Sequence, residues 1–89
     1  MNITEVRVWP VRNKESKIKA TASIVIDGAI MIHDLRVVEG SNGLFVAMPS
    51  RKTTDGNYRD IAHPITAEAR EVIQNKVLAE YQKLLASVS

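Results

Sequence analysis

The sequence predicts a single α+β domain, an antiparallel meander sheet of four to five strands followed by one long C-terminal amphipathic helix. Two observations favour this class. Residues 3–62 alternate short apolar runs with turn-forming residues, and residues 66–86 carry apolar side chains at the spacing of a helix. A chain of 89 residues has room for one core. We therefore treat residues 1–89 as one domain, with its sheet over about 3–62 and its helix over about 66–86.

Residues 3–12 are expected to form the first strand, in which Val6 and Val8 share one face under two-residue alternation. Pro10 interrupts this strand, because proline has no backbone N–H to donate to a neighbouring strand. The strand is therefore expected either at a sheet edge or with a bulge at Trp9 and Pro10.

A turn over residues 13–16 is expected to lead into the clearest strand pattern of the chain, residues 17–27. Alternation places one apolar set toward the core: Ile18, Ala20, Ala22, Ile24 and Ile26. Asp27 and Gly28 follow and form a strong hairpin signal. The third strand is therefore expected to return alongside the second over residues 29–38.

Apolar residues occupy both faces at the start of the third strand, over residues 29–32. Either this strand is central in the sheet, or its second face is covered by another subunit. A turn over residues 39–43, rich in glycine, leads to a fourth strand over residues 44–48. Pro49 is expected to end that strand.

Residues 50–60 are expected to be a polar loop, and residues 58–62 to form a brief fifth strand. Thr66 is a suitable N-cap for a helix over residues 67–86. Its expected apolar stripe comprises Val72, Ile73, Val77, Tyr81, Leu84 and Leu85.

The expected helix is longer than the expected sheet is wide. A helix of roughly 20 residues spans about 30 Å, whereas four strands are about 15–20 Å wide. Leu84 and Leu85 at its end therefore need a further surface to pack against. The simplest candidate is a second copy of the sheet, so we expect a homodimer with exchanged helices.

Composition and the titratable residues exclude several classes of function. The chain has no cysteine and a net charge of +2, and no apolar run approaches the length of a membrane span. We expect a cytoplasmic protein without a membrane segment. His33 and His63 lie in no metal-ligand spacing, and no nucleophile motif or glycine-rich phosphate loop is present. Asp34 and Arg36 are expected to form an ion pair. We therefore expect no enzyme activity, no cofactor, no metal site and no small-molecule substrate.

Two basic clusters are candidate contacts for a polyanion. The first cluster follows Pro49 and comprises Arg51, Lys52 and Arg59. Arg51 and Lys52 are expected where the polar loop begins. The second is a platform on one sheet face and comprises Arg7, Lys17 and Lys19, with Thr21 and Ser23 beside them. The alternative for each cluster is a solvated surface without a ligand.

Aromatic residues beside basic groups are typical of proteins that bind single-stranded nucleic acids, because bases stack on flat rings. Trp9 and Tyr58 lie near the basic clusters and are candidates for stacking. Phe45 and Tyr81 are expected in the core.

Several segments resemble the stage V sporulation protein G family, SpoVG. These are His33–Gly40, Asn42–Ser50 (Asn-Gly-Leu-Phe-Val-Ala-Met-Pro-Ser), Asp55-Gly56 and Arg59–Ile65. The resemblance implies a bacterial meander sheet with a C-terminal helix, dimeric through exchanged helices. It also implies a regulator that binds DNA, and in some members RNA, and that affects septation, sporulation and surface or virulence gene expression. It assigns phosphate contacts to Arg51 and Lys52, with Arg59 as a weaker addition.

The sequence is also compatible with a second function of a different class. The chain could be a protein-interaction module in cell division, recruiting partners through its first strand and the end of its helix without touching nucleic acid.

Overall fold

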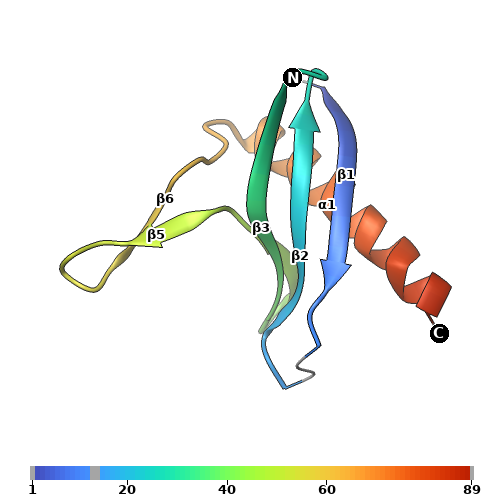
Figure 1. Cartoon of the computed structure of the whole chain (residues 1–89), viewed down its shortest axis with the longest axis horizontal. Coiled ribbons are helices and arrows are strands. Elements are labelled where there is room, and N and C mark those ends of the chain that lie inside the picture. The colour runs from blue at the N-terminus through green and yellow to red at the C-terminus, as the bar shows by residue number, and fades with distance from the viewer. Residues whose placement is uncertain (1, 13–14, 89) are drawn as a thin grey trace.

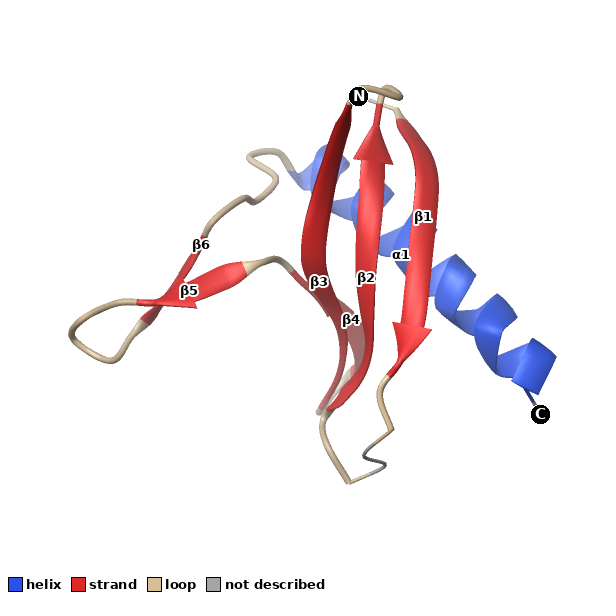
Figure 2. Cartoon of the chain, viewed as in Figure 1, coloured by secondary structure: helices blue, strands red, loops and turns tan. Residues whose placement is uncertain are grey.

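A four-stranded antiparallel sheet, a separate two-stranded hairpin and one helix make up the computed structural model, which describes residues 2–12 and 15–88. Asn13 and Lys14 of the expected first turn lie outside the described residues. The sheet has the order β1-β2-β3-β4, and the helix covers one of its faces (Figures 1 and 2). The element bounds are β1 Ile3–Pro10, β2 Ile18–Ile26, β3 Ile30–Gly40, β4 Gly43–Ala47, β5 Ser50–Lys52, β6 Tyr58–Asp60 and α1 Ala67–Val88.

Strand β1 is an edge strand, which confirms the first of the two alternatives for Pro10, and the second, a bulge at Trp9 and Pro10, is not formed. Trp9 pairs with Thr21 and Pro10 with Ala20 without interruption. An edge strand has one side free of partners, so a proline there need not break the ladder. The irregularity lies instead at Thr4, whose Oγ1 accepts a hydrogen bond from Gly28 N at 3.0 Å.

The hairpin between β2 and β3 is confirmed. Asp27 and Gly28 have φ angles of 53° and 62°, and Ala29 N donates to Ile26 O at 3.0 Å. Positive φ at both central residues matches the twist of the flanking strands, which explains why aspartate and glycine occupy this turn.

Strand β3 contains a bulge that was not predicted. Ile24 pairs with Ile32 whereas Ala22 pairs with Leu35, so β3 carries one extra residue between these pairs. Asp34 within the bulge has a φ of 67°, a conformation that aspartate tolerates better than most side chains. The bulge returns Leu35 to the core face.

Strand β3 lies between β2 and β4 in the sheet order, but β4 pairs only with its second half, from Arg36 to Gly40. At its doubly apolar start, Ile30 and Met31 are 60% and 42% exposed, so a central place in the sheet does not bury them. Cover by another subunit, the second alternative, stays a prediction. The turn to β4 is shorter than expected, because Gly40 pairs directly with Gly43.

The core lies between the sheet and α1. Its fully buried large side chains are Ile24, Leu35, Val37 and Val77. Tyr81 is buried as expected, but the expectation of a core position for Phe45 is wrong, since Phe45 is 42% exposed. Val46, the next residue, faces the core opposite Val37, so strand alternation turns Phe45 to the other face.

Residues 50–60 form a hairpin rather than a polar loop. β5 and β6 pair with each other in a second, two-stranded sheet, so the expected fifth strand does not join the meander. The hairpin projects away from the four-stranded sheet (Figure 1).

Helix α1 begins where the sequence predicts. Thr66 Oγ1 accepts a hydrogen bond from Ala69 N at 3.0 Å, which confirms the N-cap. Ile73, Val77 and Tyr81 of the expected stripe are buried against the chain's own sheet, whereas Leu85 is 43% exposed. The exchange of helices between subunits stays a prediction. Within the described residues, no helix has the length and apolarity needed to cross a membrane.

Candidate nucleic-acid interface

The β5–β6 hairpin is held at both ends by backbone hydrogen bonds. At its base, Ile61 N donates to Pro49 O at 2.7 Å. At its tip, Thr53 N donates to Asn57 O at 2.7 Å and Gly56 N donates to Thr53 O at 3.1 Å. The cations of the hairpin therefore sit on a defined backbone rather than on a flexible loop.

The side chain of Asp55 organises the tip. Its carboxylate accepts hydrogen bonds from Thr53 Oγ1, from Asn57 N at 3.3 Å and from Asn57 Nδ2 at 3.2 Å. These donors favour the ionised carboxylate, and the Thr53 hydroxyl contributes most to lowering the pKa of Asp55 below its usual 3.8. The one acidic side chain at the tip is thus occupied by local hydrogen bonds.

The hairpin register brings Arg51 and Arg59 together. They are direct partners across β5 and β6, so their side chains leave the same face of the ribbon. Lys52 pairs with Tyr58, on the opposite face. All four side chains are exposed.

Like charges directly opposite each other on paired strands are unfavourable. Among the ion pairs found in residues 2–12 and 15–88, none engages Arg51, Lys52 or Arg59. The two arginines share an open hollow of about 470 Å³. Its lining residues are Arg51, Thr53, Thr54, Arg59, Asp60 and Ile61. Its two guanidinium groups outnumber the one carboxylate, that of Asp60, and are suited to an anion with several oxygens, such as a phosphate.

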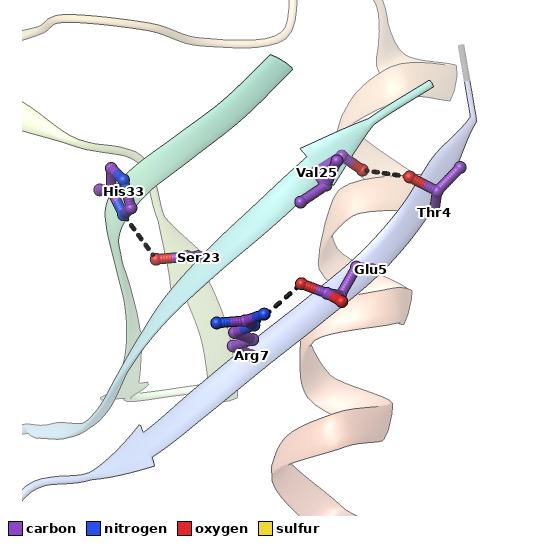
Figure 3. Close-up of polar contacts among 6 residues, drawn as sticks. All are labelled: Thr4, Glu5, Arg7, Ser23, Val25 and His33. Carbon is purple, nitrogen blue, oxygen red and sulfur yellow. Dashed lines mark hydrogen bonds and ion pairs between the residues drawn. The ribbon is translucent and has the colours of Figure 1, made fainter. Parts of the chain in front are cut away.

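The predicted platform on the sheet is a weaker cationic surface than the sequence suggested. Arg7 Nε lies 2.8 Å from Glu5 Oε2 on the same strand (Figure 3). Ser23 is buried, and its Oγ lies 3.0 Å from His33 Nδ1. This polar face is therefore partly neutralised and partly occupied by internal contacts.

The remaining members of the platform do not form a row with Arg7. Lys17 precedes β2, and Lys19 lies at an irregularity in the β2–β3 register and is half-buried. The hairpin extends from the β3 side of the sheet, away from β1 (Figure 1). The structure thus groups Arg51, Lys52 and Arg59, and does not bring Arg7 to them.

Arg36 is a residue that the sequence did not assign to the site. Its Nη2 donates to Ser50 Oγ at 3.1 Å, joining β3 to the base of the hairpin. The expected ion pair with Asp34 is not formed, and the buried Nε of Arg36 has no hydrogen-bond partner. The bulge at Asp34 alters the alternation on which that expected pair rested. Only the fold reveals Arg36 as a neighbour of β5.

A second open hollow lies beside the first and shares Arg59 and Asp60 with it. It measures about 410 Å³ and is lined by Tyr58, Arg59, Asp60 and His63. Tyr58 is 69% exposed. His63 Nδ1 lies 3.1 Å from Pro64 O, which can only accept, so Nδ1 carries a proton.

Metal binding has no support in the arrangement of side chains. Among the described residues, no group of three or more His, Cys, Asp or Glu side chains is placed to hold an ion.

Comparison with known proteins identifies close relatives across the chain. A family model described as SpoVG matches residues 1–83. The protein named "Putative septation protein SpoVG" from Heliobacterium modesticaldum is 60% identical over 87 residues, covering 98% of this chain and 97% of the relative. Proteins of the same name from Clostridium perfringens and Agathobacter rectalis are each 52% identical. These matches cover 94% and 99% of this chain, and 92% and 100% of the relatives.

Proposed function

This chain belongs to the SpoVG family, and from that premise we propose that it is a bacterial regulatory protein that binds DNA or RNA. Its relatives carry names that refer to septation. In this proposal the protein affects septation, sporulation or surface and virulence gene expression by binding nucleic acid through the β5–β6 hairpin.

The observation that carries the proposal is the cross-strand pair of Arg51 and Arg59. Two adjacent guanidinium groups without carboxylate partners repel each other in the free protein. A phosphate placed between them removes that repulsion and gains charge-assisted hydrogen bonds. Lys52 adds a third positive charge on the other face of the same strand.

A dimer presents the hairpin twice, which gives six cations for phosphate contact. Release of condensed counterions then predicts a slope of about −5 for log K against log salt on duplex DNA. Phosphate contacts position a protein on the strand and do not by themselves specify a base sequence.

The experiment is a binding titration on DNA and on RNA across a salt series. The test variant is Arg51→Ala with Lys52→Ala, and the matched control is Lys76→Ala with Lys83→Ala, which removes the same charge from the exposed side of α1. Removing two contacts from each hairpin should reduce the slope from about −5 to about −2 on duplex DNA. The control should change it little.

The outcome against the proposal is equally definite. If the hairpin variant keeps the affinity and slope of the unchanged protein, the hairpin is not the site. We expect the hairpin variant to stay folded, because both replaced side chains are exposed and because removing Arg51 relieves its repulsion with Arg59. Weakened binding would therefore report lost contacts and not unfolding. Circular dichroism of each variant checks this point.

The second candidate function is a protein-interaction module in cell division. Its support is apolar exposure on the first strand and near the helix end, where Trp9 is 50% and Leu85 43% exposed. A folded protein that shows no salt-dependent binding to DNA or RNA favours this function over the first.

A further inference from the structure

We propose that the hairpin holds an unpaired nucleobase in the hollow beside Tyr58, and that the protein therefore prefers single-stranded to duplex nucleic acid. This inference rests on the proposed function, since it concerns the same hairpin. It adds a base-binding site to the phosphate contacts of Arg51 and Arg59.

The two hollows of the hairpin are adjacent, and Arg59 and Asp60 line both of them. They differ in their other residues. The first adds a second arginine, Arg51, which suits a phosphate. The other adds the ring of Tyr58 and the imidazole of His63, which suit a base. A nucleotide has the same two parts, a phosphate joined through its sugar to a flat base.

Tyr58 is suited to stacking because little of the described chain covers it. The residue is 69% exposed, and its hydroxyl makes no hydrogen bond to a described residue. A tyrosine that contributes to no core and projects beside arginines is the arrangement found where single strands stack on proteins. Its cross-strand partner Lys52 places a further cation next to the ring.

Asp60 and His63 supply hydrogen-bond acceptors at the same hollow. A ring that donates from Nδ1 to Pro64 O has its Nε2 as an acceptor whenever it carries a single proton. The carboxylate of Asp60 accepts as well, and carboxylates pair with exocyclic amino groups such as cytosine N4. We therefore expect a base that carries an amino group to be favoured at this position over thymine or uracil.

A duplex cannot use this hollow without being opened. Its bases stack on one another and pair along the edges that Asp60 and His63 would contact, and extruding one costs a few kcal/mol. A single strand offers the same phosphates together with free base faces. The preference for a single strand is thus a consequence of the aromatic hollow and not of the charges.

The test compares one oligonucleotide, carrying a single 2-aminopurine, as a free strand and as a duplex at one salt concentration. The free strand should bind more tightly, with quenching of the 2-aminopurine fluorescence as its base stacks on Tyr58. Tyr58→Ala should weaken single-strand binding about 5- to 150-fold, abolish the quenching and leave the salt slope unchanged. Tyr58→Phe, which keeps the ring, should behave as the unchanged protein.

A second readout tests the acceptors. Binding to oligo-dC and oligo-dT should differ in favour of dC, and Asp60→Asn should reduce this ratio. The ratio is the measurement, because removing a negative charge raises affinity for both strands.

The outcomes separate this inference from the proposal beneath it. Salt-dependent binding with equal affinity for strand and duplex, unaffected by Tyr58→Ala, overturns the base site and leaves the phosphate contacts intact. Absence of any salt-dependent binding overturns both.

Discussion

The carboxylate of Asp55 determines the state of the hairpin tip at the scale of single residues. It accepts from the Thr53 hydroxyl and from two nitrogens of Asn57, and these bonds favour the ionised form. The same hydrogen bonds direct the carboxylate toward residues of the tip itself. Ionisation of Asp55 therefore strengthens the side-chain hydrogen bonds that support the turn between β5 and β6.

A pH dependence follows from the lowered pKa of Asp55. A carboxyl with a lower pKa in the folded than in the unfolded chain stabilises the fold above its unfolded value, here about 3.8. That stabilisation is lost as the pH falls through the folded pKa. We expect faster amide hydrogen exchange at Asn57 and Gly56 as the pH falls below 3.8, after correction for intrinsic exchange.

Asp55→Asn is the control for this dependence, because an amide cannot titrate. After correction for intrinsic exchange, the amide hydrogens at the tip of this variant should exchange at a rate that does not change as the pH falls. A tip that responds identically in both proteins would show that another group is responsible.

The sequence identified the cations of the hairpin but not their arrangement. Arg51, Lys52 and Arg59 stand out by residue type and by resemblance to the family. That Arg51 lies opposite Arg59 depends on a register set by the turn at residues 53–57. Arg36 could not be found by pattern, because its contact with Ser50 joins strands from two different sheets.

Among the elements, α1 depends on a single capping side chain at its start. Thr66 Oγ1 accepts from Ala69 N, one of the amides that has no partner within the helix. Thr66→Ala should lower the free energy of unfolding by about 1 kcal/mol, within a range of roughly 0.5–2. Urea denaturation followed by circular dichroism at 222 nm measures the change.

Thr66→Ser is the matched variant, since serine keeps the hydroxyl and caps at least as well as threonine. Equal stability of the alanine and serine variants would mean that the hydroxyl does not contribute. Because the cap lies outside the hairpin, neither variant should alter nucleic-acid affinity.

Regular strands and turns were predictable because their signals are local. The alternation in β2 and the Asp27-Gly28 turn each follow from neighbouring residues. Bulges were not, since they depend on the partner strand. One signal was present: Ile32 and Leu35 are three positions apart yet share the core face, which strict alternation forbids.

The sequence of the β5–β6 hairpin indicates a loop for a related reason. Ser50, Arg51 and Lys52 are polar throughout, as are Arg59 and Asp60, so no alternation marks them as strands. Their pairing is held by backbone hydrogen bonds at the base and tip and not by burial of side chains. Elements that bury little carry little pattern in sequence.

At the scale of the whole molecule, α1 reaches beyond the surface it covers. Its C-terminal end extends past β1 (Figure 2), and Leu85 is 43% exposed there. The outer face of the sheet also exposes Trp9 and Phe45. Burial of these apolar surfaces in a second copy of the chain would gain roughly 25 cal/mol per Å², which supports the homodimer expected from the length of the helix.

The dimer is tested by replacing the exposed leucine and a matched polar neighbour. We expect the unchanged protein to sediment as a dimer, Leu85→Glu to dissociate at micromolar concentration, and Gln82→Glu, which adds the same charge at another exposed helix position, to stay dimeric. If each helix packs on the sheet of its own chain, helix content should be equal in all three proteins, because neither replaced side chain belongs to the buried core. If the helices are exchanged, each core needs two chains, so the unfolding midpoint should rise with protein concentration and Leu85→Glu should lose helix content where it dissociates. A monomeric unchanged protein, or a dimer indifferent to Leu85→Glu, would contradict this assembly. Each hairpin would then have to bind its polyanion with three cations, and the salt slope on duplex DNA should be about half of −5.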